Sequence, residues 1–235
     1  MQERLKTILD ATVREYIASG EPVSSLRLYE DYDLGIKSAR IRAILNELTE
    51  MGLLVQPHTS GGRIPSDKAL ELFVNDALQS IEEHPAHRAV KREIREEFRG
   101  GDFEDFVRIV SHELELLGAG YDTRRRDFYV SGLDELVRSL DIESRSELYE
   151  IVHDFERLKD RIGRWTEKLE PKEKTGEVQV FIGRKSPITE SPHLAVMAGR
   201  LVRDGEEILL VTIGSKRMDY QKNIKFYKAI ENLFN

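Results

Sequence analysis

The sequence contains no cysteine, which excludes disulfide bonds and thiolate metal ligands in a chain of 235 residues. It also lacks a long apolar run, because none approaches the roughly 18 residues that a membrane-spanning helix needs. The amphipathic start MQERLKTILD has no signal-peptide core. We therefore expect a cytoplasmic protein without a membrane partner.

The sequence also lacks an excess of positive charge, since 43 acidic residues outnumber 36 basic ones. The net charge of −7 argues against non-specific binding to nucleic acid. The cations nevertheless concentrate in two stretches of the N-terminal third. Residues 35–46 hold Lys37, Arg40 and Arg42 without any acid, and residues 51–66 add Arg63, again without an acid. An acidic chain with two local basic stretches can still bind a nucleic acid at one place.

Three short helices are predicted at the N-terminus. Apolar residues at helical spacing run over 4–18, and SGEP at 19–22 ends that helix. A second helix runs from Ser24 or Ser25 to Tyr32, and a third from about residue 37 to 51, where Gly52 is placed as the C-terminal cap. The residues expected to pack are Leu26, Leu28, Tyr29, Ile41, Ile44, Leu45 and Leu48.

Two short extended segments follow, over 53–56 and about 62–64, and a long helix begins near Ser66, whose hydroxyl is placed to cap it. Helices two and three with these segments predict a winged helix-turn-helix. We assign residues 1–80 to this domain with its trailing helix. Residues 81–102, which contain Pro85, are expected to form a helical linker.

Residues 103–235 read as a mixed domain of helices and antiparallel strands. We expect a helix over 103–117, a strand over 127–132, a solvated loop over 170–177, a strand from Val178, a hairpin at Asp204-Gly205 and a final helix from about Asp219. Ser144 and Glu147 form a capping box. It opens one long helix expected to bury Leu148, Ile151, Val152, Phe155, Leu158, Ile162 and Trp165. The fold class is therefore α+β.

The third helix is the predicted recognition helix. Residues near the N-terminus of such a helix meet base edges in the major groove, where Arg and Lys donate to guanine acceptors. Ser24 and Ser25, in the first turn of the second helix, can donate to a phosphate. The base-contacting positions are Lys37, Ser38, Arg40 and Arg42.

The predicted wing, PHTSGGR, contains residues suited to the sugar-phosphate backbone. Gly61 and Gly62 permit a close approach, and Thr59 and Ser60 offer neutral donors. Arg63 can anchor a phosphate or enter a minor groove. His58 is assigned either a donor role or a structural role at the base of the wing.

No catalytic or metal-binding pattern emerges from the sequence. His112 and His153 have no partners at ligand spacing, and Ser215 is not in a nucleophile-elbow setting. SGGR lacks the tail of a phosphate-binding loop. We therefore expect neither an enzyme nor a cofactor or metal site.

Several segments resemble the HrcA-type heat-inducible transcription repressors. These are EYIASGEPVSS (15–25), YDLGIKSARIR (32–42), PHTSGGRIPSD (57–67), DFYVSGLDEL (127–136), VFIGRKSPI (180–188) and TIGSKRMDYQKNI (212–224). The resemblance implies a winged helix followed by a GAF-like domain. It further implies a dimer that binds an inverted-repeat operator before chaperone genes, with a chaperonin keeping the repressor competent.

The chain departs from the family pattern at two places. It has only AGYDTRRR where typical members carry more sheet and an inserted dimerisation domain, and it has Arg40 where a smaller polar residue is usual. We expect a dimeric repressor of heat-shock or chaperone genes. The alternatives are a ligand-gated winged-helix regulator with an unrelated operator, and a winged-helix protein-interaction module.

Overall fold

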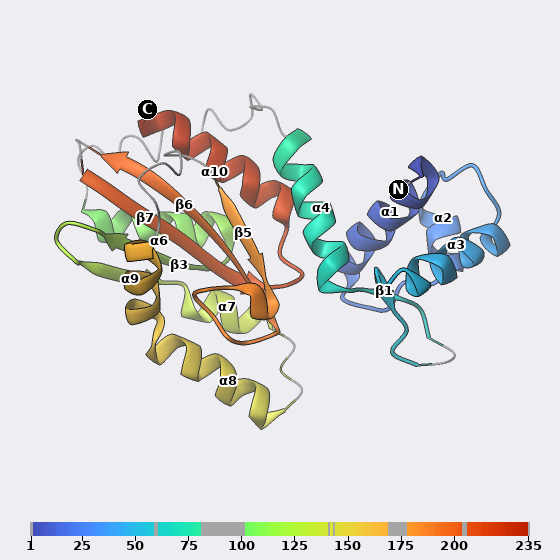
Figure 1. Ribbon diagram of the computed structural model, residues 1–235, viewed down its shortest axis with the longest axis horizontal. Helices are drawn as coiled ribbons and strands as arrows, with labels where there is room; N and C mark the ends of the chain where they lie inside the picture. The colour runs from blue at the N-terminus through green and yellow to red at the C-terminus, as the bar shows by residue number, and fades with distance from the viewer. Residues whose placement is uncertain are drawn as a thin grey trace. The chain divides into compact units, whose positions relative to one another are not determined.

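The computed structural model describes residues 2–58, 61–80, 102–140, 142, 144–168, 178–203 and 206–234 (Figure 1). The chain divides into two compact units, Met1–Asp76 and Ala77–Asn235. The sequence predicted a helical linker over 81–102, a solvated loop over 170–177 and a hairpin tip at Asp204-Gly205. Apart from Asp102, all three lie outside the described residues.

The first unit has the elements of a winged helix-turn-helix. Ser24 caps the second helix by accepting a hydrogen bond from the Arg27 N–H, at 3.1 Å. Gly52 ends the third helix with a φ of 70°, and Ser66 accepts from the Ala69 N–H at 3.3 Å. The elements are α1 (Glu3–Ser19), α2 (Ser25–Asp31), α3 (Ser38–Glu50), β1 (Leu54–Val55), β2 (Ile64–Pro65) and α4 (Asp67–Ser80).

The core of this unit contains the predicted stripe of α3 but only part of the predicted face of α2. Ile41, Ile44, Leu45 and Leu48 are buried, as is Leu28. The prediction that Leu26 and Tyr29 pack inward is wrong, since both are exposed. Because α2 has only seven residues, it buries one narrow side, on which Ser25 and Leu28 lie three positions apart.

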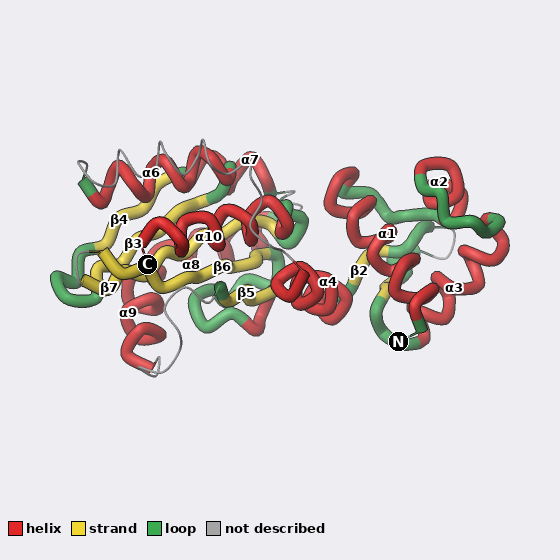
Figure 2. The backbone as a smooth tube through the Cα atoms, turned by 90° about the horizontal axis from the view of Figure 1, so that it is seen from above, coloured by secondary structure: helices red, strands yellow, loops and turns green. Residues whose placement is uncertain are grey.

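The second unit is built on one antiparallel sheet with the strand order β4-β3-β7-β6-β5 (Figure 2). Neighbouring strands pair antiparallel throughout the sheet, and the longest pairing joins β6 and β7 from Leu194↔Ser215 to Arg203↔Glu206. The strands are β3 (Leu117–Asp122), β4 (Phe128–Ser131), β5 (Gln179–Ile182), β6 (Leu194–Arg203) and β7 (Glu206–Ser215). The predicted α+β fold class is confirmed, because a winged helix-turn-helix is followed by a domain with an antiparallel sheet and helices.

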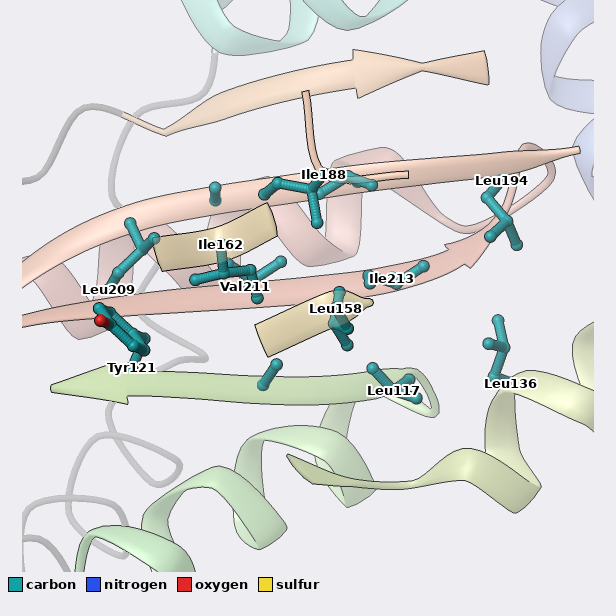
Figure 3. Packing of buried hydrophobic residues seen from close by; sticks show 13 residues of the cluster. Leu117, Tyr121, Leu136, Leu158, Ile162, Ile188, Leu194, Leu209, Val211 and Ile213 are labelled. Atoms are coloured by element: carbon teal, nitrogen blue, oxygen red, sulfur yellow. The ribbon is translucent and has the colours of Figure 1, made fainter. Parts of the chain in front are cut away.

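Helices cover both faces of this sheet. On one face, Leu158 and Ile162 of α9 (Leu158–Lys168) and Leu136 of α7 (Leu133–Ser139) pack on alternate residues of β3, β6 and β7 (Figure 3). On the other face lie α6 (Phe103–Leu114) and α10 (Tyr220–Phe234). There the ring of Tyr227 lies over Gly199, and its buried hydroxyl donates to the Met197 carbonyl at 3.2 Å. Burial raises the pKa of this tyrosine.

Strand β3 was missed from the sequence because two of its residues are glycines, which disfavour strands. The glycines are explained by the close packing of α6. A Cβ on Gly120 would lie 2.5 Å from Val107 Cγ2 and 2.6 Å from the ring of Phe103. The predicted helix over 103–117 accordingly stops at Leu114, where Glu115 takes a left-handed conformation.

The predicted single helix after Ser144 is two helices, α8 (Arg145–Glu156) and α9, with a break at Arg157. Ser144 caps α8 as expected, accepting from the Glu147 N–H at 3.1 Å. The prediction that Leu148 and Val152 are buried is wrong. Because the chain changes direction at the break (Figure 1), α8 and α9 do not continue one apolar stripe. A one-turn 3-10 helix, η1 (Gly183–Lys185), follows β5.

Candidate nucleic-acid interface

Helix α3 presents an exposed face opposite its buried stripe. Ala39, Ala43 and Asn46 are exposed, and their spacings of four and three place them on one side of the helix. Arg40 and Arg42 are exposed on the two flanks of this side. The small side chains leave room for the helix to approach a groove, while the two guanidinium groups can reach outward on either flank.

The N-terminal end of α3 is favourable for an anion. Lys37 is the N-cap residue and is exposed, and the first turn contains no acid. The helix dipole adds a partial positive charge at this end. The end of α3 that is expected to meet DNA therefore combines a lysine, two arginines and the positive pole of the helix.

The serine hydroxyls near this end are used within the protein. Ser38 Oγ donates to Ser25 Oγ at 3.3 Å, and Ser25 is only 7% exposed. Ser24 is exposed, but its hydroxyl oxygen caps α2. These hydroxyls fasten the start of α3 to the start of α2, and their contact with DNA stays a prediction.

Arg27 is held by other residues of the same unit. Its Nε lies 2.6 Å from Oε1 of the buried Glu15, whose second oxygen accepts a hydrogen bond from the Tyr32 hydroxyl at 3.2 Å. Burial, and secondarily the Glu15 carboxylate, raises the pKa of Tyr32. This network joins α1 to α2 and therefore orients the helix that supports α3.

The wing has a third strand segment that the sequence did not reveal. β1 pairs with β2 through Leu54↔Pro65 and Val55↔Ile64. In addition, Val23 forms a bridge with Arg63, with two backbone N–H···O bonds of 2.8 Å. Beyond this bridge, His58 is exposed and its carbonyl accepts the Gly61 N–H at 2.9 Å. Thr59 and Ser60, two of the predicted wing contacts, lie outside the described residues.

Gly62 permits this third segment to form. An ideal Cβ at this position would lie 2.5 Å from the Pro22 carbonyl oxygen and 2.6 Å from the carbonyl carbon of Val23. Both atoms belong to the backbone and cannot turn away as a side chain would. The sequence predicted that Gly62 lets DNA approach closely. The structure shows that Gly62 also leaves room for the backbone of Pro22 and Val23.

The guanidinium of Arg63 fastens the wing to α3. Its Nη2 donates to Asn46 Oδ1 at 2.6 Å, its Nε donates to Thr49 Oγ1 at 3.1 Å, and its Nη1 donates to the Gly61 carbonyl at 3.3 Å. Asn46 and Thr49 were missed in the sequence because nothing local links α3 to a residue 14 to 17 positions later. Asn46 and Thr49 lie three positions apart on α3, and only the folded position of Arg63 shows that they share a hydrogen-bond donor.

We expect Arg63→Ala to lower the free energy of unfolding by about 1–2 kcal/mol, because it removes three hydrogen bonds, two of them partly buried. It should also weaken binding to DNA, since the wing loses its attachment to α3. Urea unfolding and fluorescence anisotropy with duplex DNA measure the two effects.

Asn46→Ala is the matched control, because it removes the shortest of these hydrogen bonds and no charge. If Arg63 only fastens the wing, both variants weaken DNA binding with the same salt dependence as the parent chain. If Arg63 contacts a phosphate, only Arg63→Ala reduces the salt slope, by about one.

The described part of the second unit has no comparable group of side chains that could perform chemistry. Among the described residues, no group of three or more His, Asp or Glu side chains could hold a metal ion. His153 stacks on Tyr149 with ring centroids 5.9 Å apart.

An open hollow of about 650 Å³ lies in the second unit. Its lining consists of Tyr121, Gly163, Asp160, Glu167 and the cations Arg126, Arg157, Lys159 and Arg164. No described helix is long and apolar enough to cross a membrane.

Known proteins resemble this chain both in sequence and in fold. The family model described as HrcA protein C terminal domain matches residues 63–224. The heat-inducible transcription repressor HrcA of Anabaena sp. (strain L31) is 49% identical over 82 residues, which are 35% of this chain and 23% of that protein. The repressor of the same name from Synechococcus sp. (strain JA-3-3Ab) is 54% identical over 77 residues, 33% of this chain and 20% of that protein.

The aligned stretches therefore span about a quarter or less of these curated relatives. A crystal structure of a protein described only as hypothetical has a TM-score of 0.73 and 17% identity, and the match covers 100% of this chain and 96% of that one. At this identity the likeness shows the fold alone.

Proposed function

The chain belongs to the HrcA family, whose model covers residues 63–224, and from this premise we propose that it is a sequence-specific DNA-binding repressor of heat-shock or chaperone genes. The observation that carries the proposal is the acid-free, exposed N-terminal half of α3 beside a wing that Arg63 fastens to it. The curated relatives are named heat-inducible transcription repressors, which supports the same function. The proposal includes no enzymatic step.

The proposed contacts divide into those with bases and those with the backbone. Helix α3 enters the major groove, where Lys37, Arg40 and Arg42 donate to base acceptors or adjacent phosphates. Ala39 and Ala43 keep the helix close to the groove floor. Residues 58–62 of the wing lie along the sugar-phosphate backbone, and the fastening of Arg63 to Asn46 fixes the distance between wing and helix.

A dimer on an inverted repeat completes the proposal. One winged helix reads few base pairs, whereas two copies on half-sites one helical turn apart, about 34 Å, read twice as many. We assign DNA binding to residues 1–80 and dimerisation to residues 103–235. The protein is proposed to act in the cytoplasm, where a repressor reaches its operator.

Selection from a random pool of duplex DNA by the purified chain tests this function. The expected result is enrichment of an inverted repeat, with half-sites about one helical turn apart. Failure to enrich any sequence, together with retention of protein partners, would favour the interaction module. Binding of the chain to the selected operator is then measured with and without chaperonin. This comparison tests whether the chaperonin raises the fraction of the chain that binds DNA.

The ligand-gated alternative has a separate readout. It predicts that a metabolite raises the melting temperature of the protein. Over the same range of metabolite concentration, the affinity of the protein for the selected operator should change. The cationic hollow beside Arg126 and Arg164 is where such a ligand would bind, so anionic metabolites are the appropriate probes.

A further inference from the structure

Helix α8 is packed with two of its acidic side chains inward. Glu147 and Asp154 are buried together with Ile151. The Asp154 carboxylate accepts the N–H groups of Glu190 and Ser191, both at 2.8 Å, and lies 3.1 Å from Arg161 Nη1. Two backbone donors and an arginine therefore fix the inward face of this helix.

The outward face of α8 is apolar at its centre. Leu148, Tyr149 and Val152 are 43%, 69% and 47% exposed. Val152 lies four positions after Leu148 and three after Tyr149, so the three side chains form a continuous patch on one side of the helix. Large apolar side chains gathered on an exposed helix face indicate a surface that another protein covers.

Charged residues of opposite sign mark the two ends of this face. Arg145 begins α8 and Glu156 ends it, and both are exposed. The steps 145, 149, 152 and 156 follow helical spacing, so these charges lie on the same side as the apolar patch. Each charge also stands at the end where the helix dipole disfavours it. Stability of the isolated helix therefore does not account for their placement.

We propose that the outward face of α8, Arg145, Leu148, Tyr149, Val152 and Glu156, pairs antiparallel with the same face of a second copy of this chain across a twofold axis. In the register centred on the patch, Arg145 meets the partner's Glu156 and Tyr149 meets the partner's Val152. A parallel pairing would instead oppose like charges. The face is thus complementary to itself, as a twofold interface requires.

This inference deepens the proposed function, on which it rests, by naming the surface that joins two repressor chains. The test is the dimer dissociation constant of the full chain, measured by analytical ultracentrifugation for the parent, Arg145→Glu, Glu156→Arg and the double variant. Each single reversal puts like charges together at two symmetric contacts, so we expect about tenfold weaker dimerisation. The double variant exchanges both signs and should restore the parent value.

The helix dipole provides a built-in control for folding. An acid at the start of α8 and a base at its end favour the isolated helix, so neither single variant should lose helical structure by circular dichroism. Glu150→Arg is the matched control, because Glu150 is exposed on the same helix but lies near the inward residues, three positions from Glu147 and four from Asp154. It should leave the dissociation constant unchanged.

Three outcomes overturn the interface: a monomeric parent chain at all concentrations, single reversals without effect, or a double variant no better than the single ones. The proposed DNA-binding function is read separately, with a duplex carrying one half-site. A single reversal should leave half-site affinity unchanged while weakening dimerisation. Loss of half-site binding in the parent chain contradicts the repressor function and not the α8 interface.

Discussion

Gly62→Val is expected to detach the wing from the segment before α2 and to lower the free energy of unfolding by about 2–4 kcal/mol. The new Cβ would lie 2.5 Å from the Pro22 carbonyl oxygen, which belongs to the backbone. The chain must therefore open the bridge between Val23 and Arg63 and lose its two hydrogen bonds of 2.8 Å. Urea unfolding, followed by circular dichroism, measures the change.

The same substitution should weaken operator binding by more than about tenfold, because the wing no longer keeps its position beside α3. Gly61→Ala is the matched control: its Cβ would lie 3.3 Å from the His58 carbonyl oxygen, a tight contact that a small shift relieves. A Gly62→Val chain with unchanged stability, and with the Val23 and Arg63 amides still protected from hydrogen exchange, would contradict this explanation of Gly62.

The double substitution Arg40→Ala and Arg42→Ala is expected to reduce affinity for the selected operator by at least about thirtyfold. Each bidentate contact between arginine and guanine contributes about 1–3 kcal/mol of discrimination, so losing two removes most of the preference for the operator. The fold should be unaffected, since both side chains are exposed and the buried stripe of α3 is untouched. Fluorescence anisotropy at one fixed salt concentration measures the change against a scrambled duplex.

Loss of two positive charges weakens any interaction with DNA, so the comparison needs a control of equal charge. Arg4→Ala with Lys68→Ala removes two exposed cations from α1 and α4 of the same unit. We expect this control to retain the ratio of operator to scrambled affinity. If the two double variants lose that ratio equally, α3 does not read the sequence.

The winged helix was predictable because its signals are local. Ser24 and Ser66 cap their helices where the sequence placed them, and Gly52 takes the left-handed conformation expected after α3. The apolar residues of α3 repeat at three and four positions, which is sufficient to orient a helix of 13 residues. Local patterns of this kind also indicated four of the five strands of the sheet.

The remaining features depend on contacts between residues far apart in the sequence. Strand β3 contains glycines because α6 packs closely on it, and nothing within the strand shows this. The burial of Glu147 and Asp154 turns the inward side of α8 away from Leu148 and Val152, because the loop at 190–191 donates to the Asp154 carboxylate. The hydrogen bond between Arg63 and Asn46 crosses 17 positions, so no spacing rule could reveal it.

Contact between α3 and DNA is tested most directly by photo-crosslinking with a photoreactive amino acid at position 43. Ala43 lies at the centre of the exposed face of α3, and Thr7, exposed on α1, is the comparison position. We predict crosslinks from position 43 to bases within each half-site of the selected operator, and none from position 7. Crosslinks from position 7 without any from position 43 would contradict DNA recognition by α3.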